Sequence, residues 1–228
     1  MAEDTLETLQ HNARLRREIE DQITRRFAAE DDVLRETIKA QAEAGLPDIQ
    51  ISPIQGRLLQ VLAAAGNVYK ILEIGALGGY SGTWLARALP MGGRLITLEL
   101  DQKHAEVVRA AFARAGLSDR TEVRVGPAAE LLPALQSEAP FDMFFIDANK
   151  DGYPIYLDWA LKLARPGSII VADNNIRYGR PFQDQPEGDN AGVAAYNERI
   201  ATDPRLRSIL LPIDEDGMDG FAISVVLP

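Results

Sequence analysis

From residue 70 onward, short apolar runs alternate with helical segments, and this alternation is the feature that most constrains the fold. Five runs have the length and composition of strands, and they cover residues 70–75, 94–100, 121–125, 141–146 and 168–172. The segments between them have helical patterns, at 83–89, 102–115, 128–135 and 153–163. Strands that alternate with helices at this spacing form βαβ units. The sequence therefore predicts a parallel sheet with helices on both faces.

The end of the chain departs from this pattern. Two strand-like runs, Leu206 to Ile213 and Phe221 to Leu227, flank the turn-rich residues 214–217. Two strands joined by a short loop are typical of an antiparallel pair. We therefore expect an α/β protein with a doubly wound, Rossmann-like, seven-stranded sheet that is mostly parallel and has an antiparallel C-terminal strand.

Helices are predicted before this sheet. Apolar residues recur at helical intervals among charged neighbours, which predicts one or two amphipathic helices; these residues are Leu6, Leu9, Leu15, Ile19, Ile23 and Phe27. A second helical segment, 31–44, stops at Gly45-Leu46-Pro47, and another helix opens at Ser52-Pro53. We divide the chain into an N-terminal helical segment, 1–45, and a main domain, 46–228.

Composition excludes several classes of function. The chain has 228 residues, and its 24 basic and 34 acidic side chains give a net charge of −10, which argues against a surface that coats DNA. Cysteine is absent, which excludes disulfides, Cys-ligated zinc, iron–sulfur clusters and a Cys nucleophile. No apolar run approaches the roughly 18 residues of a membrane span, and the first residues lack a signal-peptide core. We therefore expect a soluble, cytoplasmic protein.

The first predicted strand ends in a glycine-rich turn, EIGALGGYSG, at residues 73–82. Glycines allow the backbone to approach a ligand where a Cβ would clash. The pattern is not Gly-x-Gly-x-x-Gly, so the dinucleotide fingerprint is missing. Glu73 would repel a pyrophosphate, and no Lys or Arg lies between Glu73 and Arg87. The turn therefore favours a ligand that is neutral or cationic at this point.

A second acid, Glu99, ends the next strand, 26 residues after Glu73. Doubly wound folds place a carboxylate here to accept hydrogen bonds from ribose hydroxyls. Taken singly, Glu99 could be a solvated charge and the glycines could merely shape a turn. Together they favour a nucleoside without phosphate whose cationic part lies near Glu73. This description fits S-adenosylmethionine better than NAD.

Two later strands end in oxygen-bearing side chains. Asp147 follows the fourth strand, and Asp173 and Asn174 follow the fifth. If these strands are parallel neighbours, the three side chains converge at one edge of the sheet. Two carboxylates and an amide oxygen suit Mg²⁺, Ca²⁺ or Mn²⁺, although the Asp173-Asn174 pair alone would also fit a turn.

Lys150 lies three residues beyond Asp147. A divalent cation nearby would destabilise an ammonium group and favour the neutral amine that a general base needs. A lone lysine is more often a surface charge, and only its position favours a catalytic role.

These motifs, in this order, resemble the cation-dependent class I S-adenosylmethionine O-methyltransferases, the family of the catechol and caffeoyl-CoA O-methyltransferases, and especially its bacterial members. The resemblance covers residues 45–228. The segments that carry it are IQISPIQG at 49–56, LEIG through GYS at 72–81, TLE at 97–99, FIDANK at 145–150 and ADN at 172–174.

The resemblance implies how the cofactor is held. Residues at the methionine end of S-adenosylmethionine would be Glu73, Gly75 and Ser81, and Ala76 would also bind the cofactor. Glu99 would hold the ribose, and Gly126, Pro127 and Ala128 would border the adenine. Ile49 and Ile51 would lie over the cofactor, and Asp147 would face it as well.

The resemblance also implies the chemistry. Asp147, Asp173 and Asn174 would bind the cation, with Mg²⁺ as the first expectation, and Lys150 beside Asp147 would be the catalytic base. The methyl group would pass to a hydroxyl of a small catechol-like or phenolic acceptor. Family members are commonly dimers, and the helical segment 1–45 could serve dimerisation or act as a lid.

The sequence departs from the family near the acceptor. Asn149 stands where a second acid is common, and Arg177, followed by Tyr178, stands where relatives tend to have an aromatic residue. Arg177 and Arg180 could face an anionic group of the acceptor, although loop arginines are usually solvated. Residues 179–192 have the composition of a mobile loop over this pocket.

Three other functions stay open at this point. A hydroxylated tRNA base could be the methyl acceptor, although the net charge of −10 argues against binding to nucleic acid. An NAD-dependent oxidoreductase lacks support because the dinucleotide fingerprint is missing. A catalytically silent binding protein would have no need of Asp147, Lys150, Asp173 and Asn174 together.

Overall fold

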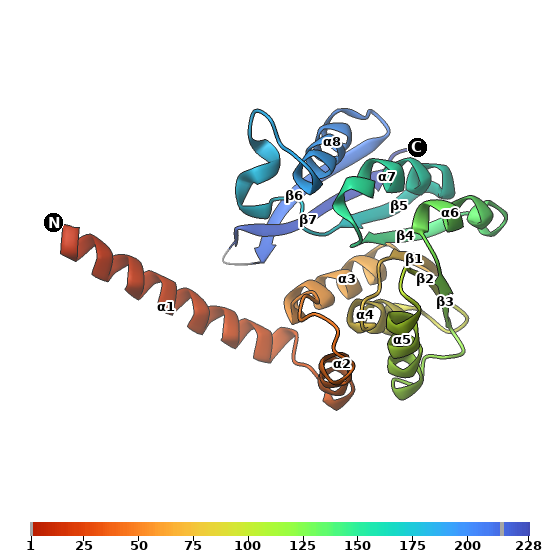
Figure 1. Ribbon diagram of the computed structural model, residues 1–228, viewed down its shortest axis with the longest axis horizontal. Helices are drawn as coiled ribbons and strands as arrows, with labels where there is room; N and C mark the ends of the chain where they lie inside the picture. Colours follow the sequence, from red (N-terminus) through yellow and green to blue (C-terminus); the bar gives the residue numbers. More distant parts are fainter. Residues whose placement is uncertain (1, 215–216) are drawn as a thin grey trace.

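A seven-stranded sheet with the strand order β3-β2-β1-β4-β5-β7-β6 forms the centre of the computed structural model, which describes residues 2–214 and 217–228 (Figure 1). The strands are β1 (Lys70–Ile74), β2 (Arg94–Glu99), β3 (Thr121–Val125), β4 (Phe141–Ile146), β5 (Ala164–Ala172), β6 (Leu206–Asp214) and β7 (Asp219–Val226). Strands β1 to β5 pair in parallel, whereas β7 runs antiparallel to both of its neighbours, β5 and β6. The predicted fold class is confirmed, and the last strand enters the sheet between β5 and β6.

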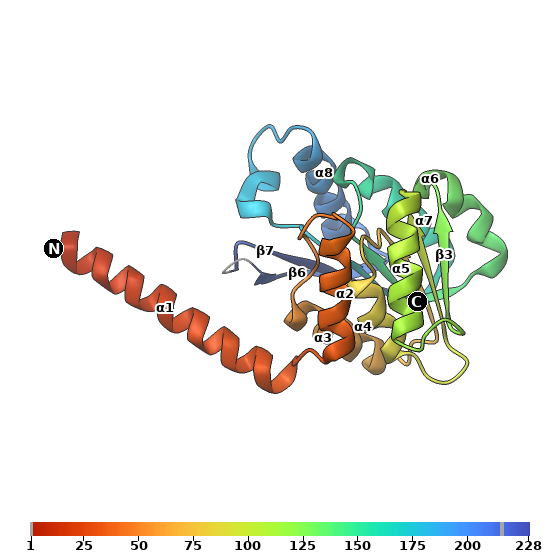
Figure 2. The ribbon, with the colours of Figure 1, turned by 60° about the horizontal axis from the view of Figure 1, so that its bottom comes forward.

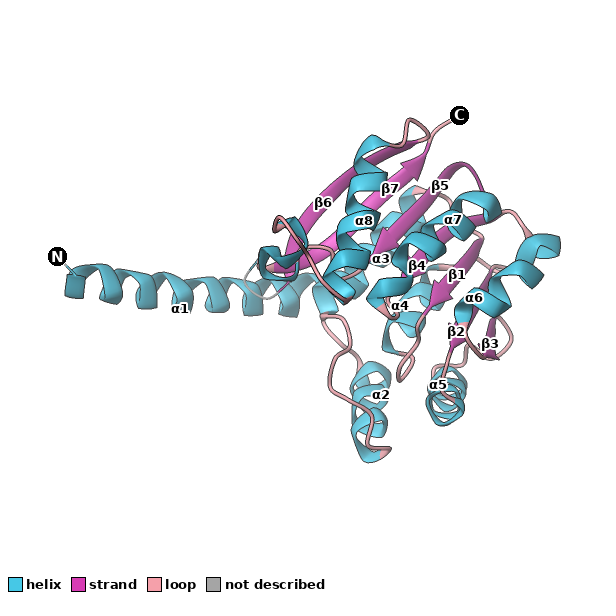
Figure 3. Ribbon diagram, turned by 45° about the horizontal axis from the view of Figure 1, so that its top comes forward, coloured by secondary structure: helices cyan, strands magenta, loops and turns pink. Residues whose placement is uncertain are grey.

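Helices cover both faces of the sheet (Figure 3). One apolar core lies under α2 (Asp32–Glu43), α3 (Pro53–Ala65), α4 (Tyr80–Ala88) and α5 (Gln102–Arg114). The other lies under the 3₁₀ helix η1 (Leu132–Glu138), α7 (Tyr153–Leu163) and α8 (Asp189–Thr202). Successive strand residues point to opposite faces, so Ile71 packs in the first core and Leu72 in the second. Because both faces are covered, the central strands are almost wholly apolar.

Two local predictions need correction. Residues 128–135, expected as one helix, form a single turn, α6 (Ala128–Leu131), that continues as the 3₁₀ helix η1. Pro133 explains the change, because proline has no N–H for the α-helical ladder. The fifth strand begins at Ala164 rather than at residue 168, with a register irregularity between Phe141 and Met143 of β4.

Residues 179–192 are not one loop. Residues 179–182 belong to the 3₁₀ helix η3 (Arg177–Phe182), and α8 begins at Asp189. The polar sequence at the start of α8 conceals the helix from pattern reading. Its close packing requires Gly192, since a Cβ there would lie 2.3 Å from the carbonyl oxygen of Lys150, in the 3₁₀ turn η2 (Lys150–Gly152).

The N-terminal helix, α1 (Ala2–Phe27), extends away from the rest of the molecule (Figures 1 and 2). It is one continuous helix where the sequence predicted one or two. Four apolar side chains on it are 41–67% exposed: Leu15, Ile19, Ile23 and Phe27. Among the described residues, no helix combines the length and the apolar character that crossing a membrane requires.

Candidate active site

A cavity of about 1080 Å³ opens at the carboxyl ends of β1, β2, β4 and β5. The order of the sheet reverses at β1, and crevices at such switch points bind the ligands of open α/β sheets. All but one of the residues predicted to form the site line this cavity. The predicted residues that line it are Ile49, Ile51, Gly75, Ala76, Ser81, Glu99, Gly126, Pro127, Ala128, Asp147, Lys150, Asp173 and Asn174. The exception is Glu73, which is fully buried and is not among the lining residues.

The turn after β1 passes very close to the end of β4. Gly75 has φ +94°, and a Cβ there would lie 2.1 Å from the carbonyl oxygen of Asp147. Only glycine combines this backbone conformation with this approach. The glycine turn therefore fixes the spacing between the predicted cofactor side of the cavity and Asp147.

Glu73 acts on the site from beneath the cavity wall. Its Oε1 accepts a hydrogen bond of 2.7 Å from the Ser81 hydroxyl, which does line the cavity. Burial raises the pKa of Glu73 to about 7, and the charges of Asp147 and Glu99 add to this rise. A positive charge placed near Ser81 would favour the ionised form of this carboxyl, in line with the cationic ligand expected from the sequence.

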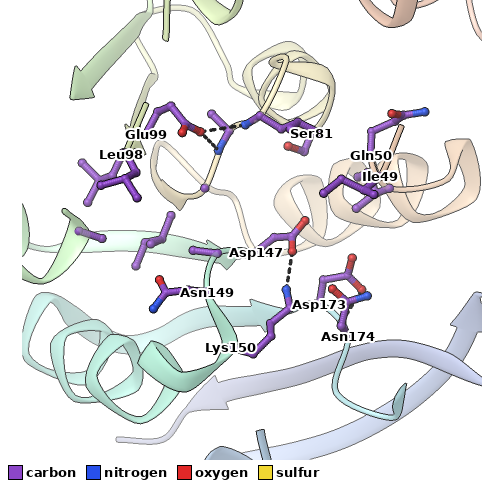
Figure 4. A pocket seen from close by; sticks show the side chains of 18 of the residues that line it. Ile49, Gln50, Ser81, Leu98, Glu99, Asp147, Asn149, Lys150, Asp173 and Asn174 are labelled. Carbon is purple, nitrogen blue, oxygen red and sulfur yellow. Dashed lines mark hydrogen bonds and ion pairs between the residues drawn. The ribbon is translucent and has the colours of Figure 1, made fainter. Parts of the chain in front are cut away.

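Glu99 is a buried structural anchor as well as a lining residue. It is 7% exposed, and its Oε2 accepts the backbone N–H groups of Ala76 and Leu77 at 3.1 and 2.9 Å. Its Oε1 accepts the N–H of Asp101 at 3.0 Å. The alternative of a solvated charge at a strand end is therefore wrong, because the carboxylate holds the glycine turn in place (Figure 4).

The three predicted cation ligands come together from β4 and β5 (Figure 4). Asp173 is 5% exposed, and its Oδ1 accepts the N–H of Asn174 at 2.7 Å. Burial raises the pKa of the Asp173 carboxyl well above its usual range, and the charge of Asp147 raises it further. Asp173 and Asn174 also form a turn, as the alternative interpretation of this pair expected, since Asn174 has φ +56°.

This set fits a hard divalent cation. Asp147 and Asp173 both line the cavity, where their carboxylates repel each other, and a cation between them would offset that repulsion. The described residues contain no group of three or more His, Cys, Asp and Glu side chains placed to hold a metal. The candidate set has only two such residues, and its third oxygen comes from an amide.

Lys150 is not a surface charge. It is 8% exposed, and its Nζ donates to Asp147 Oδ1 at 2.7 Å and to the Tyr153 hydroxyl at 2.8 Å. The Tyr153 hydroxyl in turn donates to the carbonyl oxygen of Asp173 at 2.8 Å. The lysine is thus held between the ends of β4 and β5, at the cavity.

Sequence reasoning missed two buried partners of these side chains. Tyr153 supports Lys150, and Gln55 donates from Nε2 to Asp173 Oδ1 at 3.3 Å. Gln55 also closes a capping box with Ser52 at the start of α3. That capping box could have been read from the sequence, but its contact with a residue 118 positions away could not.

The predicted acceptor side of the cavity is lined by Arg177, Tyr178 and Arg180. Arg177 donates from Nε to Asn190 Oδ1 at 2.8 Å and lies 3.8 Å from Asp189 Oδ2, so α8 holds its guanidinium. The guanidinium of Arg180 stacks on the Tyr178 ring, 5.9 Å from its centroid. Asn149, where a second acid is common in the family, accepts a hydrogen bond from the Tyr156 hydroxyl.

Comparisons with known proteins agree with this geometry. A family model described as O-methyltransferase matches residues 24–222. A protein of Niastella koreensis named catechol O-methyltransferase is 45% identical over 201 residues, which cover 86% of this chain and 91% of that protein. A Mycobacterium tuberculosis protein of the same name is 41% identical over 201 residues, covering 88% of this chain and 91% of that one.

Solved structures with the same fold include methyltransferases with bound cofactor. The O-methyltransferase of Bacillus cereus in complex with SAH matches with a TM-score of 0.85 and 39% identity, over 92% of this chain and 97% of that one. The Streptomyces achromogenes enzyme of tomaymycin synthesis, in complex with SAM, matches with a TM-score of 0.87 and 39% identity, over 92% and 96%.

The sheet order and the cavity at its carboxyl edge define a Rossmann-like methyltransferase. The chain belongs to the O-methyltransferase family. It is an S-adenosylmethionine-dependent enzyme, as its sequence motifs implied, and not an NAD-dependent oxidoreductase.

Proposed function

We propose that this enzyme transfers the methyl group of S-adenosylmethionine to a hydroxyl of a small catechol-like acceptor, and that a divalent cation is required. The observation that carries this proposal is the convergence of Asp147, Asp173 and Asn174 beside Lys150, at the cavity. The relatives named catechol O-methyltransferase support the choice of acceptor.

The cofactor would lie along the turn after β1. Glu99 lines the cavity at the end of β2, where ribose hydroxyls can donate to a carboxylate. Gly126, Pro127 and Ala128 line the wall beyond β3, where the adenine would lie. The sulfonium end would then lie near Ser81, above the buried carboxyl of Glu73.

Asp147, Asp173 and Asn174 would hold the cation. A cation held there would supply the Lewis acidity that makes an acceptor hydroxyl more acidic. The Nζ of Lys150, in its neutral form, would accept the hydroxyl proton. The acceptor oxygen would attack the methyl carbon in line with the C–S bond, which breaks and leaves S-adenosylhomocysteine. The buried hydrogen bond from Lys150 to Tyr153 would keep the amine in place.

A methyl-transfer assay with paired acceptors tests this function. Catechol can offer two adjacent hydroxyls to one cation, and phenol only one. We expect catechol to react at least ~100-fold faster than phenol, since two contacts both bind and direct the attacking oxygen. Excess EDTA should remove the catechol reaction, and added Mg²⁺ should restore it. Full turnover in EDTA would refute the cation, and transfer to tRNA but not to catechol would refute the acceptor class.

We also propose that α1 joins two copies of the chain. Leu15, Ile19, Ile23 and Phe27 recur every four residues, so they form one exposed apolar stripe on a helix that extends away from its own domain. We expect Ile19→Glu with Ile23→Glu to convert a dimer into a monomer in light scattering. Arg17→Glu, on the opposite side of the helix, should leave the mass unchanged. A wild-type chain that is monomeric at micromolar concentration would contradict the proposal.

A further inference from the structure

A strained segment follows β5 and carries one of the proposed cation ligands. We call residues 174–178 the strap. Three of its residues, none of them glycine, have left-handed backbone angles: Asn174 with φ +56°, Arg177 with φ +45° and Tyr178 with φ +56°. L-residues seldom adopt this conformation, so it persists only where surrounding contacts determine it. The strap leads from the cation site to the acceptor wall, so whatever fixes it affects both.

One carboxylate makes most of these contacts. Asp219, the first residue of β7, is 6% exposed and lines the cavity. Its Oδ1 accepts three backbone N–H groups, those of Ile176 at 3.1 Å, Arg177 at 3.0 Å and Gly220 at 2.8 Å. Its Oδ2 accepts the side-chain Nδ2 of Asn174 at 3.1 Å. The two oxygens therefore have different partners: Oδ1 accepts backbone N–H groups, and Oδ2 accepts the side-chain amide of Asn174.

The contact with Asn174 decides which way its amide faces. An ionised carboxylate only accepts hydrogen bonds, whereas an amide has a donor end and an acceptor end. The NH₂ group of Asn174 must therefore face Asp219, which leaves the carbonyl oxygen as the end that is free to bind a cation. A reversed amide would present N–H groups to the cation and an oxygen to the carboxylate, and both contacts would be repulsive.

We propose that Asp219 is a positioning residue that orients the Asn174 amide for the cation. The inference rests on the cation site of the proposed function. Partners that orient metal ligands in this way typically contribute 10–100-fold to metal affinity. Asp219 itself is not placed among the ligands, because both of its oxygens are already used by the strap and by Gly220.

The variant Asp219→Asn separates orientation from support of the strap. Its amide oxygen can still accept the three backbone N–H groups, so the strap keeps its anchor. Its NH₂ group replaces Oδ2 and faces the NH₂ group of Asn174, donor against donor. Asn174 relieves this contact only by turning its amide, which removes its oxygen from the cation. The double variant Asn174→Asp, Asp219→Asn restores a donor–acceptor pair and leaves one carboxylate oxygen for the cation.

Binding of Mn²⁺ to the full chain, followed by the EPR signal of the free ion, tests the inference without an activity assay. We expect Asp219→Asn to bind Mn²⁺ 10–100-fold more weakly than the wild type, and the double variant to recover most of that loss. Melting temperature and the affinity for S-adenosylhomocysteine in EDTA should stay near the wild-type values in both. Asp203→Asn removes a carboxylate at the end of α8 that pairs with Arg205 and does not line the cavity, and it should not change Mn²⁺ binding.

Two outcomes would overturn the inference alone. One is wild-type Mn²⁺ affinity in Asp219→Asn; the other is a double variant that folds but binds as weakly as the single one, although it restores both the donor–acceptor pair and the net charge. A wild-type chain that binds no Mn²⁺ would instead refute the cation site of the proposed function, and this inference with it.

Discussion

Replacing Asp173 with asparagine should abolish methyl transfer and leave the fold intact. The variant Asp173→Asn keeps the size of the side chain and an oxygen that can accept the Asn174 N–H. It removes one of the two negative charges proposed to hold the cation. A metal ion typically stabilises the transition state of such reactions by several kcal/mol. We therefore expect kcat/KM to fall at least ~1000-fold at saturating Mg²⁺.

The fold should tolerate this change because burial already raises the pKa of the Asp173 carboxyl. A neutral amide therefore replaces a group whose ionised form is costly in the free protein. The melting temperature and the affinity for S-adenosylhomocysteine in EDTA report on this. Asp48→Asn is the matched control, because Asp48 lines the same cavity but is exposed and lies outside the cation set. Activity of Asp173→Asn within tenfold of the wild type would contradict the cation site.

Gly75→Ala should strongly destabilise the folded protein. The added Cβ would lie 2.1 Å from the carbonyl oxygen of Asp147 and 2.7 Å from its carbonyl carbon, and the backbone has φ +94°. Neither neighbour is a flexible side chain, so the β1 turn and the end of β4 must move apart. We expect the free energy of unfolding in urea to fall by about 3–5 kcal/mol, from overpacking and left-handed strain together. The displaced turn should also lose most of its affinity for the cofactor.

The variant Gly116→Ala separates the cost of overpacking from the cost of the left-handed backbone conformation. Gly116 has φ +68°, but a Cβ there would meet nothing within 4 Å. This variant should therefore show only the backbone cost, about 1–2 kcal/mol, and full cofactor affinity. Equal losses of stability in Gly75→Ala and Gly116→Ala would show that the close approach to Asp147 is unimportant.

The alternation of apolar runs with helical segments was sufficient to predict the sheet and most of the residues that line the cavity. The predicted runs 70–75, 94–100 and 141–146 contain the strands β1, β2 and β4, and parallel strands bring their carboxyl ends to one edge. This rule alone placed Asp147 near Asp173, because β4 and β5 are neighbours. Local pattern and one topological rule are therefore enough to bring the proposed ligands together.

The supporting contacts were beyond such reasoning. Gln55 reaches Asp173 across 118 positions of sequence, and Asn174 reaches Asp219 across 45. Neither partner has a local pattern that differs from an ordinary cap or turn. The start of α8 was missed for a related reason, since its polar, glycine-containing first turn is typical of a loop. Glu73 was expected in the cavity wall, and only the packing shows that it is buried beneath Ser81.

The position of β7 has a consequence for synthesis on the ribosome. Among the described residues, β6 joins the sheet only through β7, and β7 begins with the carboxylate that anchors the strap. A nascent chain that has left the ribosome only as far as β6 already contains the turn after β1. It still lacks β7, which joins β6 to the sheet, and Asp219, which anchors Asn174. We therefore expect the sheet to be completed, and Asn174 to be anchored, only after β7 has left the exit tunnel and has inserted between β5 and β6.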